Sequence, residues 1–99
     1  MFGGDMMQKL MAMKQQAEAV KDKLNQKFVS GEAGGGLVHV EMNGNRLIKK
    51  IEVNTELSTM EKEDLEDLLT VAFNRALEEA NKLQEAEMAD NVKGLFPGM

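Results

Sequence analysis

The chain of 99 residues contains no cysteine, tryptophan or tyrosine, and it has a single histidine and a single proline. Without cysteine it can form no disulfide, no thiolate nucleophile and no cysteine-ligated zinc or iron–sulfur site. Four phenylalanines are its only aromatic residues, so one chain has few large side chains with which to fill a core. We therefore expect a single small domain that associates with a second copy.

Long apolar runs are also missing. No stretch approaches the roughly 18 consecutive apolar residues that a membrane-spanning helix needs, and the first residues lack the basic and apolar regions of a secretion signal. These features favour a cytoplasmic protein without a membrane partner. The net charge is −5, but it is unevenly spread, since residues 1–27 carry +2 and residues 54–99 carry −7.

Helical periodicity predicts a first helix over residues 5–26, with Asp5 as its N-cap. Its apolar residues follow the alternating four and three spacing of a heptad seam: Met6, Leu10, Met13, Ala17, Val20 and Leu24. Lysines flank this seam on both sides, so two copies of the helix packed side by side would repel each other. We expect the seam to pack on the sheet or on the acidic second helix, and an exposed seam to favour association of two chains.

A second helix is predicted over residues 59–90. Ser58 and Glu61 have the spacing of a capping box, which marks a helix start. The apolar stripe that follows is two residues wide, as in a helix that covers a sheet: Leu65, Leu68, Leu69, Ala72, Phe73, Ala76, Leu77, Ala80 and Leu83. The helix is expected to break before Gly94, which leaves residues 91–99 as an irregular tail.

Alternating residues between the helices predict three strands, over residues 27–32, 37–42 and 46–53. Val38, Val40 and Met42 form one apolar face, and Leu47, Ile51 and Val53 form another. Alternation with one polar face is typical of an antiparallel sheet covered on one side. The Asn43-Gly44 dipeptide predicts a type I′ hairpin. Residues 1–99 thus predict one α+β domain of order α-β-β-β-α, with a three-stranded antiparallel meander flanked by two long helices.

Residues that could carry catalysis or bind a cofactor are few. The glycines of residues 31–36 lack the Lys and Ser/Thr of a phosphate loop and lead into a strand, so they are interpreted as a flexible connection. His39 has only Ser30 and the cap residue Ser58 as serine partners, without an orienting motif. The second helix has no histidine to complete a carboxylate metal site. No enzyme activity, cofactor, metal or small-molecule substrate is expected.

A basic stripe follows the first helix, and it has two interpretations. Its lysines could neutralise the phosphates of a nucleic acid, or they could flank the seam and pair with acids of the second helix. No aromatic residues are interleaved with them, which argues against recognition of single strands. The stripe consists of Lys9, Lys14, Lys21, Lys23 and Lys27.

Taken together, these segments resemble the YbaB/EbfC family of small bacterial nucleoid-associated proteins over nearly the whole chain. The resemblance implies an intertwined homodimer with paired sheets, helices that project as arms, DNA binding through those arms, a location on the nucleoid and no catalysis. It is carried by the opening Met-Phe-Gly-Gly, a Met- and Gln-rich first helix, and residues 29–38, 43–44, 51–54, 65–76 and 95–98.

The resemblance places DNA binding on the two helices. The matching basic residues are Lys9, Lys14, Lys21 and Lys23 on the first helix and Arg75 and Lys82 on the second. Because a dimer would carry twice the chain's negative charge, its overall field repels DNA, and binding must depend on a local positive surface. The alternative is an acidic interaction module that binds a basic protein partner through the C-terminal helix.

Overall fold

The computed structural model describes the backbone of residues 2–95 and the side chains of residues 5–90. The elements follow the predicted order of helix, three strands and helix. A short 3-10 helix, η1, precedes the last helix. The elements are α1 (Phe2–Asn25), β1 (Phe28–Ala33), β2 (Val38–Asn43), β3 (Ile48–Val53), η1 (Leu57–Thr59) and α2 (Lys62–Leu95).

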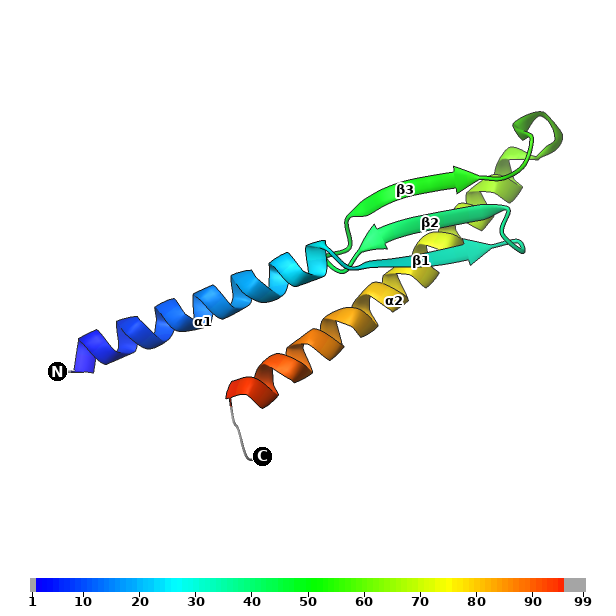
Figure 1. Cartoon of the computed structure of the whole chain (residues 1–99). Coiled ribbons are helices and arrows are strands. Elements are labelled where there is room, and N and C mark those ends of the chain that lie inside the picture. The colour runs from blue at the N-terminus through cyan, green and yellow to red at the C-terminus, as the bar shows by residue number, and fades with distance from the viewer. Residues whose placement is uncertain (1, 96–99) are drawn as a thin grey trace.

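The strands form the predicted antiparallel meander in the order β1-β2-β3, and α2 lies across one of its faces (Figure 1). The predicted core face of β2 is confirmed, because Val38, Val40 and Met42 are fully buried. Three alanines of α2 face them and are also fully buried, at positions 72, 76 and 80. Burial of this apolar surface is the main term that holds the helix on the sheet.

Gly31 has a role that the sequence did not reveal. It lies within β1, opposite Val40, as the strand predicted over residues 27–32 requires, and not in the flexible connection. A Cβ atom on Gly31 would come closer than 3.0 Å to the Ala72 carbonyl oxygen and the Ala76 amide nitrogen. Glycine on the strand and alanines on the helix therefore let the two backbones approach directly. The connection between β1 and β2 is made by the next glycines, 34 to 36, which all have positive φ.

The predicted helix ends differ from those observed. Asp5 lies in the first turn of α1, which begins at Phe2. Ser58 is not a cap, because the chain reverses after β3 through η1 and α2 begins only at Lys62. Gly94 does not end α2, which continues to Leu95. An isolated helical glycine costs only about 1 kcal/mol relative to alanine, too little to stop a helix. Residues 96–99 of the predicted tail lie outside the described residues.

The β2–β3 hairpin is confirmed, but its turn is not type I′. The Asn43 carbonyl accepts a hydrogen bond from Arg46 N at 3.1 Å, and Asn43 N donates to Leu47 O at 2.9 Å. Arg46, with φ of 65°, takes the left-handed conformation, and Gly44 does not. A tight turn followed by one left-handed residue is typical of a three-residue hairpin loop, which is one residue longer than the two-residue type I′ loop. Gly44 is needed for space, since a Cβ there would collide with Leu24 of α1.

The apolar face of β3 is not covered by its own chain, contrary to the prediction. Ile51 and Val53 pair with Val40 and Val38, so they share the face on which α2 lies. They are nevertheless 45% and 36% exposed, because α2 crosses β1 and β2. Leu47 precedes the strand and is 63% exposed. The core surface therefore continues into an open apolar area beside β3.

The predicted seam of α1 packs within this chain only at its C-terminal end. Leu24 is buried and Val20 is half-buried, whereas Met6, Leu10 and Met13 are each more than 60% exposed. The reason is visible in Figure 1, where α1 projects beyond the sheet and α2 extends past the same end while diverging from it. The molecule is consequently elongated, at 70 × 25 × 19 Å. We call residues 5–24 the α1 arm and residues 81–95 the α2 arm.

Candidate nucleic-acid interface

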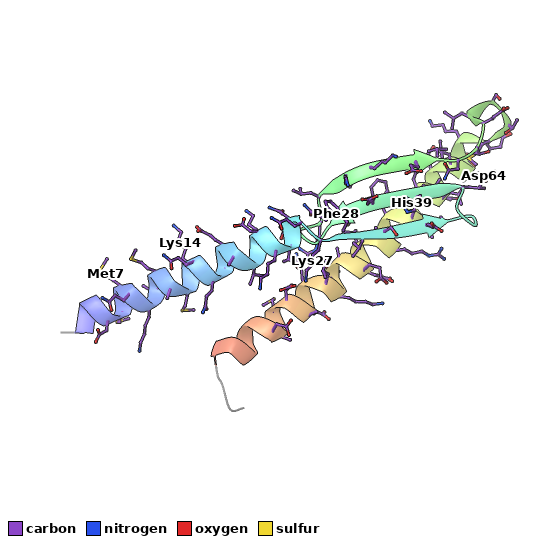
Figure 2. All side chains as sticks on the ribbon, viewed as in Figure 1. Met7, Lys14, Lys27, Phe28, His39 and Asp64 are labelled. Carbon is purple, nitrogen blue, oxygen red and sulfur yellow. The ribbon has the colours of Figure 1, made fainter. Side chains whose placement is uncertain are left out.

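The α1 arm carries four of the six predicted site residues. Lys9, Lys14, Lys21 and Lys23 are all exposed, and Figure 2 shows Lys14 projecting from the middle of the arm. Lys14 and Lys21 are two turns apart on one flank of the seam, and Lys9 and Lys23 are four turns apart on the other. From Lys9 to Lys23 the helix rises about 21 Å. The arm thus presents a basic flank on each side of an apolar stripe.

These four lysines are free of ion pairs within residues 5–90. The alternative interpretation, in which stripe lysines pair with acids of the second helix, finds no contact for these four, whereas Lys27 of the same stripe does pair with an acid of α2. The divergence of the two arms explains this, since it carries the acids of α2 away from most of α1. An unpaired ammonium group on an exposed helix is available to an anionic ligand.

The two basic residues predicted on α2 are already engaged. Arg75 Nη1 donates to the Glu32 carbonyl oxygen at 2.7 Å, which satisfies an outer carbonyl of the edge strand β1. Lys82 Nζ lies 3.2 Å from Glu79 Oε1, one turn earlier on the same helix. The structure therefore places the six predicted residues in two groups, with open cations on α1 and partnered cations on α2.

A contact between Lys27 and Glu87 joins the two arms at their base, and it agrees with the interpretation that stripe lysines pair with acids of the second helix. Lys27 lies in the connection from α1 to β1 and donates to Glu87 of α2. The Glu87 side chain is largely buried. The hydrogen bond from Lys27 lowers the pKa of Glu87, with smaller contributions from the charges of Lys27 and Lys23 opposed by burial. A charged Glu87 therefore stabilises the attachment of α2 to α1.

The Lys27–Glu87 pair predicts a pH dependence of stability. Since the folded-state pKa of Glu87 is lowered, its contribution is present above its usual value near 4.5 and is lost as the pH falls through the lowered value. Glu87→Gln should therefore unfold at lower urea than the wild type at pH 7, and this difference should shrink below about pH 4. Glu85→Gln, an exposed neighbour on α2, is the control. A difference that is constant with pH would contradict the role of the charge.

The remaining features of the described residues concern metal ligands, membrane spans, His39 and one surface hollow. Among residues 2–95 no three His, Asp or Glu side chains come together as metal ligands, and no helix there is long and apolar enough to cross a membrane. His39 Nε2 lies 3.8 Å from Glu32 Oε1 on the sheet face away from α2. A shallow hollow of about 460 Å³ lies at the far end of the molecule, between Leu37, Asp64, Leu68 and Val71.

Comparisons with known proteins agree on both fold and family. The model of the YbaB/EbfC DNA-binding family matches residues 2–95. A nucleoid-associated protein of Hahella chejuensis is 38% identical over 92 residues, which cover 93% of this chain and 85% of that protein. A nucleoid-associated protein of Acinetobacter baumannii is 40% identical over 89 residues, covering 88% and 82%. The crystal structure of an uncharacterised Helicobacter pylori protein has the same fold, with a TM-score of 0.79, 22% identity, and coverage of 93% of this chain and 97% of that one.

Proposed function

The chain belongs to the YbaB/EbfC DNA-binding family, and on this premise we propose that it is a nucleoid-associated protein that binds duplex DNA as a homodimer. The binding uses phosphate contacts along the α1 arm, and it takes place in the cytoplasm on the nucleoid, where it influences nucleoid organisation and gene expression. The observation that supports the proposal best is a set of four exposed lysines on a projecting helix, none of which forms an ion pair within residues 5–90.

Phosphate contact accounts for these side chains better than base readout does. Lysine binds phosphate as a point charge, and it lacks the planar fork with which arginine recognises bases. The acids of the same helix, Asp5, Glu18 and Asp22, reduce its net charge, so affinity should be modest. A gel-shift titration against duplexes of varied sequence tests this proposal. Affinities that differ by less than about threefold would support phosphate contact, since phosphates carry no sequence information.

The second copy of the dimer is expected to cover the open apolar area beside β3. We call this area the β3 surface, and it comprises Ile51, Val53, Leu37, Leu57 and Val71, which are 36% to 62% exposed. It continues directly from the buried face of β2, and β3 is an edge strand whose outer side is unpaired in the sheet order. An exposed edge strand with apolar side chains is a ready site for pairing with another chain.

Sedimentation should detect this dimer and its loss. The wild type is expected to be a dimer at micromolar concentration, and Ile51→Glu should shift it toward the monomer by placing a charge in the contact. Met88→Glu is the matched control, because Met88 is an equally apolar side chain, 63% exposed, on the α2 arm. It should leave the dimer intact. A wild type that stays monomeric would contradict the assignment of the β3 surface.

A basic protein partner is the second candidate. It is favoured by the acidic surface of α2, whose cations Arg75 and Lys82 are already engaged. Reversing Glu63, Asp67 and Glu78, which are exposed on this helix, should abolish binding of such a partner and spare DNA binding. Replacing the lysines of the α1 arm should instead abolish DNA binding and leave binding of the basic partner intact.

A further inference from the structure

The β2–β3 turn is bound to both arms at the point where they leave the sheet. We call this place the arm junction, and it consists of turn residues 43–47, the last turn of α1 (21–25) and residues 81–87 of α2. Hairpin turns usually run over the protein surface and face solvent. Side chains and backbone of this turn instead contact both helices, which are far apart in sequence.

On the α1 side, the turn satisfies the end of the helix. Asn45 Nδ2 donates to the Lys21 carbonyl at 2.9 Å and to Asn25 Oδ1 at 2.5 Å. The Gly44 amide donates to the Leu24 carbonyl at 2.9 Å. Leu24 lies in the last turn of α1, where carbonyls have no partner within the helix. The bonds from Gly44 and Asn45 therefore hold the end of α1 against the turn.

On the α2 side, Arg46 acts as a two-pronged donor. Its Nε donates to Asn81 Oδ1 at 2.8 Å and its Nη2 to Gln84 Oε1 at 2.7 Å. Gln84 Nε2 in turn donates to the Gly44 carbonyl at 3.0 Å. Arg46 does this from a left-handed backbone conformation, φ 65°, which residues with a Cβ seldom adopt. The left-handed backbone of Arg46 directs its side chain toward α2, where the guanidinium makes both hydrogen bonds.

The angle set at this junction decides where the lysines lie. From Val20 toward the N-terminus the α1 arm is exposed, apart from half-buried Gln16. Its direction relative to α2 is therefore set mainly at its base, by the arm junction together with the Lys27–Glu87 contact. Lys9 lies twelve residues from Lys21, about 18 Å along the helix, and a tilt of about 15° at the base would move it by about 5 Å. Phosphates follow each other at about 3.4 Å of rise along one strand. A tilt of this size is enough to change which phosphates the lysines meet.

We propose that Arg46, Asn81, Gln84 and Asn45 are positioning residues, which fix the angle between α1 and α2 and so place the α1 lysines for phosphate contact. This inference rests on the proposed function, because it assumes that the α1 lysines contact DNA. It adds that residues without contact to DNA control its affinity through the geometry of the arms.

Arg46→Lys is the most discriminating substitution. Lysine keeps the positive charge and a side chain of similar length. Its single ammonium group lacks the planar guanidinium with which Arg46 donates to Asn81 and Gln84 together. If Arg46 only contacted phosphate directly, lysine would replace it with little loss. As a positioning residue, its replacement should weaken DNA binding by about tenfold, and the double variant Asn81→Ala with Gln84→Ala should do the same.

The arm angle can be measured separately, since the chain has no native cysteine. Single cysteines at Gln15 on α1 and Ala89 on α2, both exposed, would carry spin labels, with labelled protein diluted into unlabelled protein to isolate distances within one chain. Pulsed electron paramagnetic resonance should give one narrow distance distribution for the wild type. Arg46→Lys and the Asn81/Gln84 double variant should broaden or shift it.

Asn74→Ala is the matched control, because Asn74 is an exposed asparagine of α2 outside the arm junction. It should change neither the distance nor the affinity, and circular dichroism should show all variants folded. A distance distribution unchanged by both junction variants would overturn the inference, and so would a broadened distribution with undiminished affinity. If the wild type binds no DNA, the proposed function fails instead, which the affinity of the unlabelled wild type shows directly.

Discussion

Replacing Lys9, Lys14, Lys21 and Lys23 together with glutamine is expected to weaken binding to duplex DNA by at least about 100-fold at about 50 mM salt. Each lysine that contacts a phosphate releases a counterion, so its loss lowers both the affinity and the dependence of affinity on salt. The slope of log K against log salt should fall by about one for each contacting lysine. Glutamine keeps the helical propensity of the arm, so the fold should be retained.

A charge-matched control separates a local surface from the overall field. The quadruple variant lowers the formal charge of the chain by four. The combination of Lys62→Glu, Ser58→Asp and Asn74→Asp, at exposed positions away from the α1 arm, lowers it by four as well. This control should weaken binding by no more than about threefold. An equal loss in both variants would mean that net charge, and not the α1 arm, governs DNA binding.

The second large effect is expected at Gly31, where alanine should destabilise the fold by about 3 kcal/mol or more. Its Cβ would press on the backbone of α2 at Ala72 and Ala76, and backbone atoms cannot move aside as a flexible side chain can. Because native domains are stable by only about 5–15 kcal/mol, a loss of this size is large. Urea unfolding at one fixed protein concentration measures it, since dimerisation makes stability depend on concentration.

Gly35 supplies the control for this substitution. It has φ of +67° in the β1–β2 turn, and a Cβ there would meet no atom within 4 Å. Gly35→Ala should therefore cost only the left-handed strain of about 1–2 kcal/mol. If Gly31→Ala were no more destabilising than Gly35→Ala, then α2 would not lie directly on β1 as the structure has it.

The elements that were predictable from the sequence are those with strong local periodicity. Alternation identified Val38, Val40 and Met42 as the buried face of β2, and the wide apolar stripe identified α2 as the helix that covers the sheet. Both patterns reflect how often a side chain returns to the same face, and this depends only on local geometry. The order of helix, three strands and helix followed from them.

The features that the sequence left hidden depend on contacts distant along the chain. The close approach of Gly31 to α2 was hidden because it depends on Ala72 and Ala76, some 40 residues later. Pairing of a stripe lysine with an acid of the second helix was one of the two interpretations, but no local pattern selects Glu87 as the partner of Lys27, because the two lie 60 positions apart. The seam of α1 and the apolar face of β3 were expected to be covered, since a pattern shows that a face is apolar without showing which chain covers it.

The candidate site was only partly predictable for the same reason. Helical spacing was enough to place Lys9, Lys14, Lys21 and Lys23 along one helix, and the family resemblance implied that this helix projects as an arm. Neither could show that Arg75 donates to a carbonyl of β1, or that the β2–β3 turn is hydrogen-bonded to both helices. These contacts depend on the crossing of α2 over the sheet, which no local pattern encodes.

The central claim is that lysines of the α1 arm bind DNA through its phosphates, and a salt-dependent titration of the wild-type protein with a duplex tests it most directly. If four to eight lysines of a dimer contact phosphate, the slope of log K against log salt should lie between about −4 and −7. Absence of binding to duplexes of varied sequence at about 50 mM salt, or an affinity that does not change as salt rises, would contradict the claim.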